Sequence, residues 1–130
     1  MGETKTASGT FEVKLTPQAD PAAEPFLSRL ALDKQFHGDL EAISRGEMLA
    51  VGTSIPNSAG YVAMERVSGT LHGRSGSFAL QHSGTMTRGE PQLTVTVVPD
   101  SGTGELEGMS GSMKIDIRDG THFYDLAYSF

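Results

Sequence analysis

The sequence predicts an all-β protein, and three of its features favour strands over helices. First, alternation of apolar and polar residues with a period of two recurs along the chain, whereas no stretch longer than about ten residues shows helical periodicity. Second, 16 of the 130 residues are glycine, which suits the tight turns and bends of β structure. Third, Asp119-Gly120 separates two alternating runs, and an Asp-Gly pair in this position is a strong hairpin signal.

About eight strands follow from this pattern, at roughly even spacing. In the first, GTFEVKL, the side chains of Phe11, Val13 and Leu15 share one face. A Pro- and Ala-rich connection follows at residues 18–25, and a glycine-rich turn region precedes the seventh strand. A chain of this kind forms either a sandwich or a closed barrel. The expected strands cover residues 9–15, 26–36, 39–53, 61–71, 77–86, 92–99, 112–118 and 121–130.

Length and composition narrow the class of protein. A chain of 130 residues predicts one domain, residues 1–130, with a single core. The net charge of -6, with ten scattered Lys and Arg residues, argues against nucleic-acid binding, which needs a basic face. The absence of cysteine excludes disulfides and thiol chemistry. No apolar run approaches the roughly 18 residues of a membrane span, and the first residues lack the apolar core of a signal peptide, so we expect a cytoplasmic protein without membrane contact.

The central hairpin, residues 61–71 and 77–86, carries two polar residues on an apolar face. With an even-length turn, odd positions of the first strand share a face with even positions of the second. A turn centred on Gly73-Arg74 would place Glu65 directly opposite His82, with Cβ atoms about 5 Å apart. The same alternation assigns the inner and outer faces of the last hairpin, residues 112–118 and 121–130. It places His122 on the inner face next to the turn, so we expect this residue at a rim of the fold. The expected inner face of the central hairpin comprises Tyr61, Ala63, Glu65, Val67, Leu71, Phe78, Leu80, His82 and Met86.

Several stretches resemble known families. KQFHGDLEA and DSGTGELEGMSGSMKI resemble segments of plant allene oxide cyclases, locally and distantly. Over nearly its whole length the chain is similar to an uncharacterised bacterial family (domain of unknown function 3224), through GYVAMERVSGTLHGRSGSFALQHSGTM and VVPDSGTGELEGMSG. The resemblance implies an eight-stranded, mostly antiparallel, allene-oxide-cyclase-like β-barrel with a central cavity, related in shape to calycins and dirigent proteins. The plant enzymes use a Glu and a bound water for ring closure, and the resemblance assigns that role to no residue of this chain.

Glu65 and His82 are the best candidates for function, because they are the polar exceptions on an apolar face. A carboxylate beside a histidine in such a setting can act as a general acid and base, or can anchor the polar group of a ligand. The same two residues can equally form a buried hydrogen-bonded pair that only orients the barrel. Catalysis, ligand binding and structure are therefore all open for this pair.

Three functions follow from these alternatives. The leading hypothesis is a lumen that binds a small, largely apolar ligand, contacted by Tyr61, Glu65, Phe78, His82 and Tyr124. The competing one is a cofactor-independent cyclase or isomerase, with Glu65 as general base and His82 as its partner. In the third, aromatic side chains fill the lumen, and the barrel acts through its surface as a structural protein, with homo-oligomerisation expected. No cofactor motif is present, and no tight cluster of ligating residues predicts a metal site.

Overall fold

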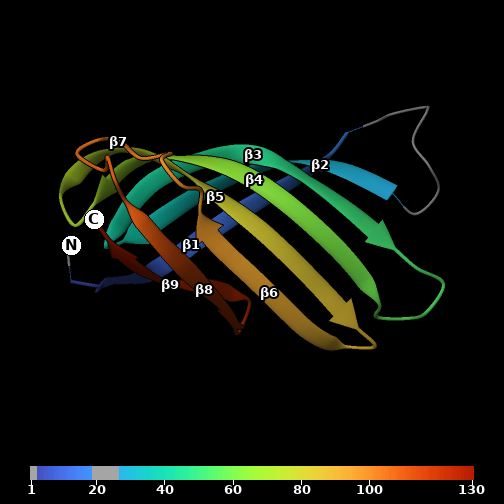
Figure 1. The fold of residues 1–130 in the computed structure, drawn as a ribbon. Coiled ribbons are helices and arrows are strands. Elements are labelled where there is room, and N and C mark those ends of the chain that lie inside the picture. The colour runs from blue at the N-terminus through green and yellow to red at the C-terminus, as the bar shows by residue number, and fades with distance from the viewer. Residues whose placement is uncertain (1–2, 19–26) are drawn as a thin grey trace.

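The structure, a computed structural model, describes residues 3–18 and 27–130, which fold entirely as strands, turns and loops (Figure 1). Most of the Pro- and Ala-rich connection, and the expected start of the second strand at Phe26, lie outside the described residues. No helix in the described part of the chain is long and apolar enough to cross a membrane. The strands are β1 (Lys5–Pro17), β2 (Leu27–Gly38), β3 (Leu40–Gly52), β4 (Ala59–Leu71), β5 (Arg74–Thr87), β6 (Glu90–Val97), β7 (Thr103–Gly104), β8 (Ser110–Arg118) and β9 (Thr121–Ser129).

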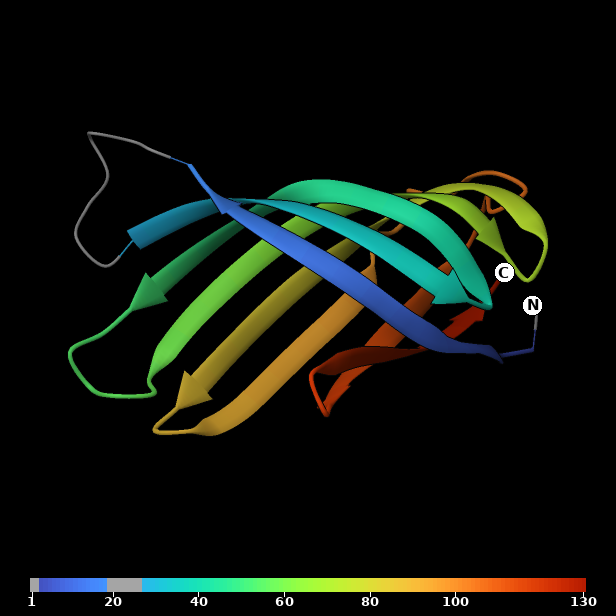
Figure 2. The ribbon, with the colours of Figure 1, turned by 180° about the vertical axis from the view of Figure 1, so that it is seen from behind.

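Eight of these strands close into a barrel (Figures 1 and 2). Their order is β4-β3-β2-β1-β9-β8-β6-β5, and a further pairing between β5 and β4 joins the two ends of this series. Every pairing is antiparallel, and the two-residue strand β7 lies outside the ring, beside β5. The all-β class and the eight-stranded antiparallel barrel predicted from the sequence are therefore confirmed. Both edges of β2, β3, β4 and β5 are paired over most of their length, whereas β6 and β8 share only two residue pairs.

The core fills one end of the barrel. Inward-facing side chains alternate with exposed ones along each strand, as a period of two requires. The segment between β7 and β8 adds Leu106 and Met109 to this core, and both are almost completely buried. The other members of the cluster with at most 1% exposure are Ala7, Phe36, Leu40, Val67, Leu71, Phe78, Leu80, Tyr124 and Leu126.

The turn of the central hairpin differs from the predicted one. The two turn residues are His72 and Gly73, because Leu71 pairs with Arg74. Their φ angles of 46° and 79° are both positive, as the favoured two-residue hairpin turns require, and glycine adopts such a conformation without a steric penalty. The prediction of a Gly73-Arg74 turn was therefore wrong. The face of each side chain was nevertheless predicted correctly. The observed pairing is shifted by two residues from the predicted one, and a shift by an even number of residues leaves every side chain on the same face of the sheet.

The end opposite the core is open along one side. Strands β6 and β8 pair only at Val95–Met113 and Thr96–Ser112, and the pairing of β1 with β9 stops at Phe11–His122. Beyond these points β1 continues to Pro17 without β9, so the β8–β9 hairpin forms a shorter part of the wall than its neighbours. Figure 2 shows β2 to β6 extending past this hairpin. The interior is therefore accessible at this end.

Candidate functional site

Four polar side chains meet inside the barrel, each from a different one of four adjacent strands. The Oε2 atom of Glu65 on β4 lies 2.8 Å from Nζ of Lys34 on β2 and 2.5 Å from Nε2 of His82 on β5. Its Oε1 atom accepts a hydrogen bond of 2.7 Å from the hydroxyl of Ser44 on β3. The Glu65 side chain has no exposed surface, and those of Lys34 and His82 are each 4% exposed. We call these four residues the polar cluster.

A glycine gives Glu65 access to its partners. Gly46 on β3 pairs directly with Glu65, so no side chain occupies the inner face of β3 at that position. A Cβ atom at Gly46 would lie 1.9 Å from the carbonyl oxygen of Met64, far inside van der Waals contact. The missing side chain lets β3 and β4 approach, and it leaves room for the Glu65 carboxylate to extend across β3 toward Lys34 on β2.

The polar cluster keeps Glu65 ionised. Burial alone would raise the pKa of this carboxyl group, but the hydrogen bond from His82 and the charge and hydrogen bond of Lys34 outweigh burial and lower the pKa to about 2. The Lys34 ammonium also lies 4.7 Å from the centroid of the Phe11 ring and 5.7 Å from that of Phe36. Lys34 and Glu65 thus form a buried ion pair whose opposite charges compensate one another.

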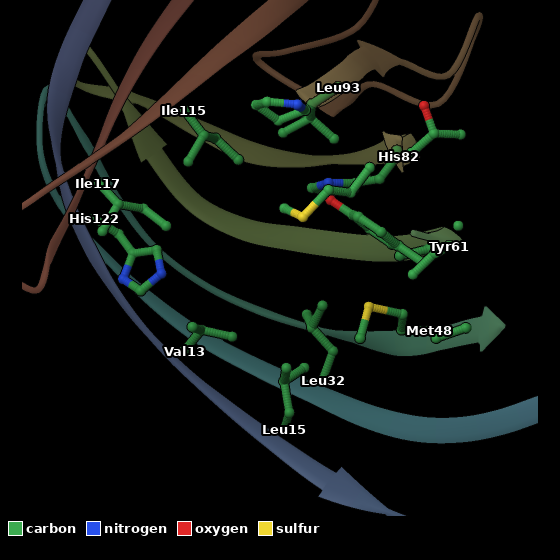
Figure 3. Close-up of a pocket in the computed structure, with 18 of the residues that line it drawn as sticks. Val13, Leu15, Leu32, Met48, Tyr61, His82, Leu93, Ile115, Ile117 and His122 are labelled. Atoms are coloured by element: carbon green, nitrogen blue, oxygen red, sulfur yellow. The ribbon is translucent and has the colours of Figure 1, made fainter. Parts of the chain in front are cut away.

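A cavity of about 500 Å³ lies beside the polar cluster and reaches the open end of the barrel (Figure 3). Side chains from several strands point into it, and most of its lining is apolar, as at Leu32 and Ile115. At its mouth Leu15, Leu93 and Ile117 keep 40–61% of their surface exposed. The residues with polar side chains in the lining are Lys34, Tyr61, His82, Thr85, Gln92 and His122.

The structure separates the predicted site residues into three places. Tyr61 and His82 line the cavity, and Glu65 lies behind His82 without forming part of the cavity surface. Phe78 and Tyr124 belong to the core and do not line this cavity. Glu65 and His82 are brought together as predicted, although the pairing places Glu65 opposite Leu80 and His82 opposite Ala63. The expected contact is therefore made between diagonal neighbours, not between directly opposite residues.

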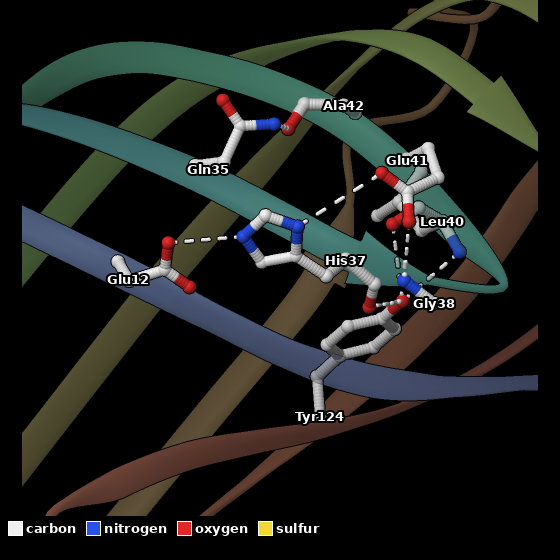
Figure 4. A network of polar contacts seen from close by, with 8 residues as sticks. All are labelled: Glu12, Gln35, His37, Gly38, Leu40, Glu41, Ala42 and Tyr124. Atoms are coloured by element: carbon white, nitrogen blue, oxygen red, sulfur yellow. Dashed lines mark hydrogen bonds and ion pairs between the residues drawn. The ribbon is translucent and has the colours of Figure 1, made fainter.

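Tyr124 has a structural environment in the core. Its hydroxyl accepts a hydrogen bond of 2.9 Å from the backbone N–H of Leu40 and lies 2.9 Å from the carbonyl oxygen of His37 (Figure 4). Burial raises the pKa of this hydroxyl to about 12. The side chain therefore connects β9 to the sharp turn between β2 and β3.

The histidine in that turn region, His37, belongs to an exposed network. Its Nε2 atom lies 2.9 Å from a carboxylate oxygen of Glu12, and its Nδ1 atom lies 4.0 Å from one of Glu41 (Figure 4). The hydrogen bond that His37 donates to the Glu12 carboxylate is the main reason why the pKa of His37 is raised. A histidine at the end of a strand, as His37 is in β2, is expected to be solvated. The network of Glu12, His37 and Glu41 is separate from the cavity.

Two members of the polar cluster were missed by the sequence analysis. Lys34 lies between Leu32 and Phe36 in the series of alternate residues of β2 that point into the barrel. Ser44 follows Ala42 in the corresponding series of β3. The alternation along each strand therefore contained the signal for both residues. Long charged side chains usually extend to solvent, so a lysine within an alternating run is commonly interpreted as exposed.

Comparisons with other proteins assign the chain to a family. A family model described as "Protein of unknown function (DUF3224)" matches residues 7–128. The chain belongs to the DUF3224 family. None of the curated proteins compared with the chain matches it.

A solved structure from the DUF3224 family has the same fold. It is the crystal structure of a protein of unknown function from Shewanella oneidensis MR-1, which is 51% identical to this chain. The match covers 98% of each chain, with a TM-score of 0.94. The DUF3224 barrel is thus shown by both the sequence and the structure, and the function has to be argued from the site itself.

Proposed function

We propose that this protein binds a small, largely apolar molecule in the barrel cavity, with the polar group of the ligand held near His82. One observation carries the proposal: an apolar cavity of about 500 Å³ reaches solvent at one end and ends against a buried, hydrogen-bonded polar cluster. Small-molecule sites generally have volumes of about 300–1,000 Å³, apolar walls and a few converging polar groups.

The exposed apolar side chains at the mouth support the same function. Leaving apolar surface in contact with water costs roughly 25 cal/mol for each Å². Met86 is 41% exposed and Ile117 is 61% exposed, although both face the cavity. A bound apolar molecule would remove this surface from water. A barrel whose lumen is entirely packed, the third hypothesis above, is less well supported, because the side chains leave this volume open.

The environment of Glu65 supports binding over catalysis. A general base works best when its pKa lies near the working pH. The carboxylate of Glu65 accepts hydrogen bonds from three side chains, and its pKa of about 2 makes it a weak base. It is also separated from the cavity surface by its partners. The geometry therefore favours a positioning role for Glu65 over proton abstraction from a substrate.

Binding can be tested with a neutral fluorescent probe, N-phenyl-1-naphthylamine. We expect saturable binding to the unaltered protein and a loss of affinity of at least about tenfold in Ala50→Trp, because Ala50 lines the cavity and an indole there would fill it. The matched control is Leu49→Trp, since Leu49 is the adjacent residue on the outer face and is 47% exposed.

A second variant, Ala59→Trp, keeps the test valid if Ala50→Trp does not fold. Ala59 lies at the exposed rim of the cavity, where Ala59→Trp would obstruct the entrance with less disturbance of the core. The far-UV circular dichroism spectrum and the melting temperature establish that each variant is folded. Absence of saturable binding to the unaltered protein, or equal losses in Ala50→Trp and Leu49→Trp, would overturn the proposal.

A further inference from the structure

The polar atoms that His82 and Tyr61 present to the cavity define what a ligand must offer. The Glu65 carboxylate can only accept hydrogen bonds when it is ionised, so the Nε2 atom of His82, 2.5 Å away, must carry the hydrogen between them. In a neutral imidazole the other ring nitrogen, Nδ1, is then a hydrogen-bond acceptor. Glu65 thereby selects the tautomer of His82.

Nδ1 of His82 is available to a ligand. Nδ1 forms no hydrogen bond with the described residues. Every fully buried polar side-chain atom in the described part of the chain has a hydrogen-bond partner, so Nδ1 is not one of the fully buried atoms. Nδ1 therefore keeps an accessible surface, and His82 is one of the residues that line the cavity (Figure 3). An acceptor in these apolar surroundings favours a ligand group that can donate a hydrogen bond.

The hydroxyl of Tyr61 provides a hydrogen-bond donor in the same cavity. The Tyr61 ring lies over Gly84, the next inward position after His82 on β5, because a Cβ atom at Gly84 would come within 2.4 Å of the ring. The hydroxyl forms no hydrogen bond with any described residue, and Figure 3 shows the side chain directed into the cavity. Burial and the nearby charge of Glu65 raise the pKa of Tyr61, so its hydroxyl is protonated and can donate.

The charges of the polar cluster make a charged ligand unfavourable. Lys34 is the cation of the cluster, and its ammonium lies 2.8 Å from the Glu65 carboxylate and against the Phe11 ring. Its charge is therefore already compensated. An anionic group in the cavity would lose its hydration without meeting a free cation, and a cationic group would lose its hydration beside the ammonium of Lys34, which lines the cavity.

From these positions we infer that the ligand is an uncharged apolar molecule with a hydroxyl group, of the alcohol or phenol class. The hydroxyl donates its hydrogen to Nδ1 of His82 and accepts one from the hydroxyl of Tyr61. This inference rests on the proposed function, and it adds to that function the chemical class of the ligand.

Three probes that share one apolar part test the inference at pH 7.5: 4-hexylphenol, its methyl ether 4-hexylanisole, and 4-hexylbenzoate. We expect the phenol to bind at least tenfold more tightly than the ether, which cannot donate, and more tightly than the anionic benzoate. In Tyr61→Phe the affinity for the phenol should fall about tenfold, because the donor to its oxygen is removed. Because the Tyr61 hydroxyl has no described protein partner, this variant leaves no buried polar group unpaired.

Nuclear magnetic resonance of ¹⁵N-labelled histidine provides an independent readout. Addition of the phenol should shift the Nδ1 resonance of His82, whereas the ether should leave it nearly unchanged. Equal affinity for phenol and ether, or tighter binding of the benzoate, would overturn the ligand class while the lumen still binds apolar molecules. If none of the three probes binds, and the naphthylamine probe also fails, the proposed function itself is wrong.

Discussion

The Nε2 atom of His82 lies 2.5 Å from a carboxylate oxygen of Glu65, although β-sheet pairing places these residues diagonally across β4 and β5. The contact is part of a larger arrangement, because the same carboxylate oxygen also accepts from Lys34. A buried carboxylate is tolerated only when it is paired and hydrogen-bonded. The pair recognised in the sequence is therefore one half of an ion-pair network that extends over four strands.

Removal of Lys34 should strongly destabilise the protein. In Lys34→Met the Glu65 carboxylate stays buried without its cation, and we expect the free energy of unfolding to fall by about 3–5 kcal/mol. The double variant Lys34→Met/Glu65→Leu should recover part of this loss, because both charges are then absent. Urea unfolding at pH 7 measures each value. The control is Arg45→Met, which breaks an exposed ion pair with Asp33 (3.4 Å) and should cost less than about 1 kcal/mol. Equal losses in the two single variants would contradict the buried pair.

Acid should weaken the fold through Glu65. Its pKa is about 2 in the folded protein and near 4.5 when the side chain is free, so the folded state binds the proton less tightly than the unfolded state. The stabilisation is therefore fully present above about pH 4.5 and is lost as the pH falls toward 2, by on the order of 3 kcal/mol in total. Glu65→Gln should lack this part of the pH dependence. Unfolding free energies at pH 7, 4 and 3 test it, and parallel curves for the two proteins would show that Glu65 contributes nothing.

Loss of the Tyr124 hydroxyl should cost more stability than loss of the Tyr61 hydroxyl. Tyr124→Phe removes the acceptor of the Leu40 N–H and the donor to the carbonyl oxygen of His37, and we expect a loss of about 1–3 kcal/mol. Tyr61→Phe removes a hydroxyl that has no described partner and should change stability by less than about 0.5 kcal/mol. Thermal unfolding of the two variants gives the comparison. A smaller loss for Tyr124→Phe than for Tyr61→Phe would show that the core hydroxyl is dispensable.

A methyl group at Gly46 should disturb the strand pair that carries Glu65. In Gly46→Ala the added Cβ atom would lie 1.9 Å from the carbonyl oxygen of Met64, so β3 and β4 must separate. We expect a loss of about 1–3 kcal/mol, as for other overpacked sites. Gly52→Ala, at the end of the same strand, is the control, because its Cβ atom would meet nothing within 4 Å. If both variants melt at the same temperature, the close approach at Gly46 is not required.

Much of the fold could be predicted from the amino-acid sequence, because a period of two is a local property of a strand. Alternation separated inward from outward residues, and turn residues marked the ends of most strands. The assignment of Glu65 and His82 to one inner face stayed correct although the predicted turn was wrong. When strand pairing shifts by an even number of residues, each side chain stays on the same face of the sheet. The period alone left a sandwich and a barrel open, and the family resemblance implied the barrel.

The sequence by itself determined the class of fold, the inner faces and the pair Glu65–His82. The tertiary structure alone decided that Lys34 and Ser44 join that pair, because closure of the barrel curves β2, β3 and β4 around one interior. It also decided that Tyr61 borders the cavity whereas Tyr124 lies in the core. These positions depend on how far the β8–β9 hairpin extends between β1 and β6. That extent is set by pairing between strands that are distant in the sequence. The alternation within a single strand does not indicate where such pairing stops.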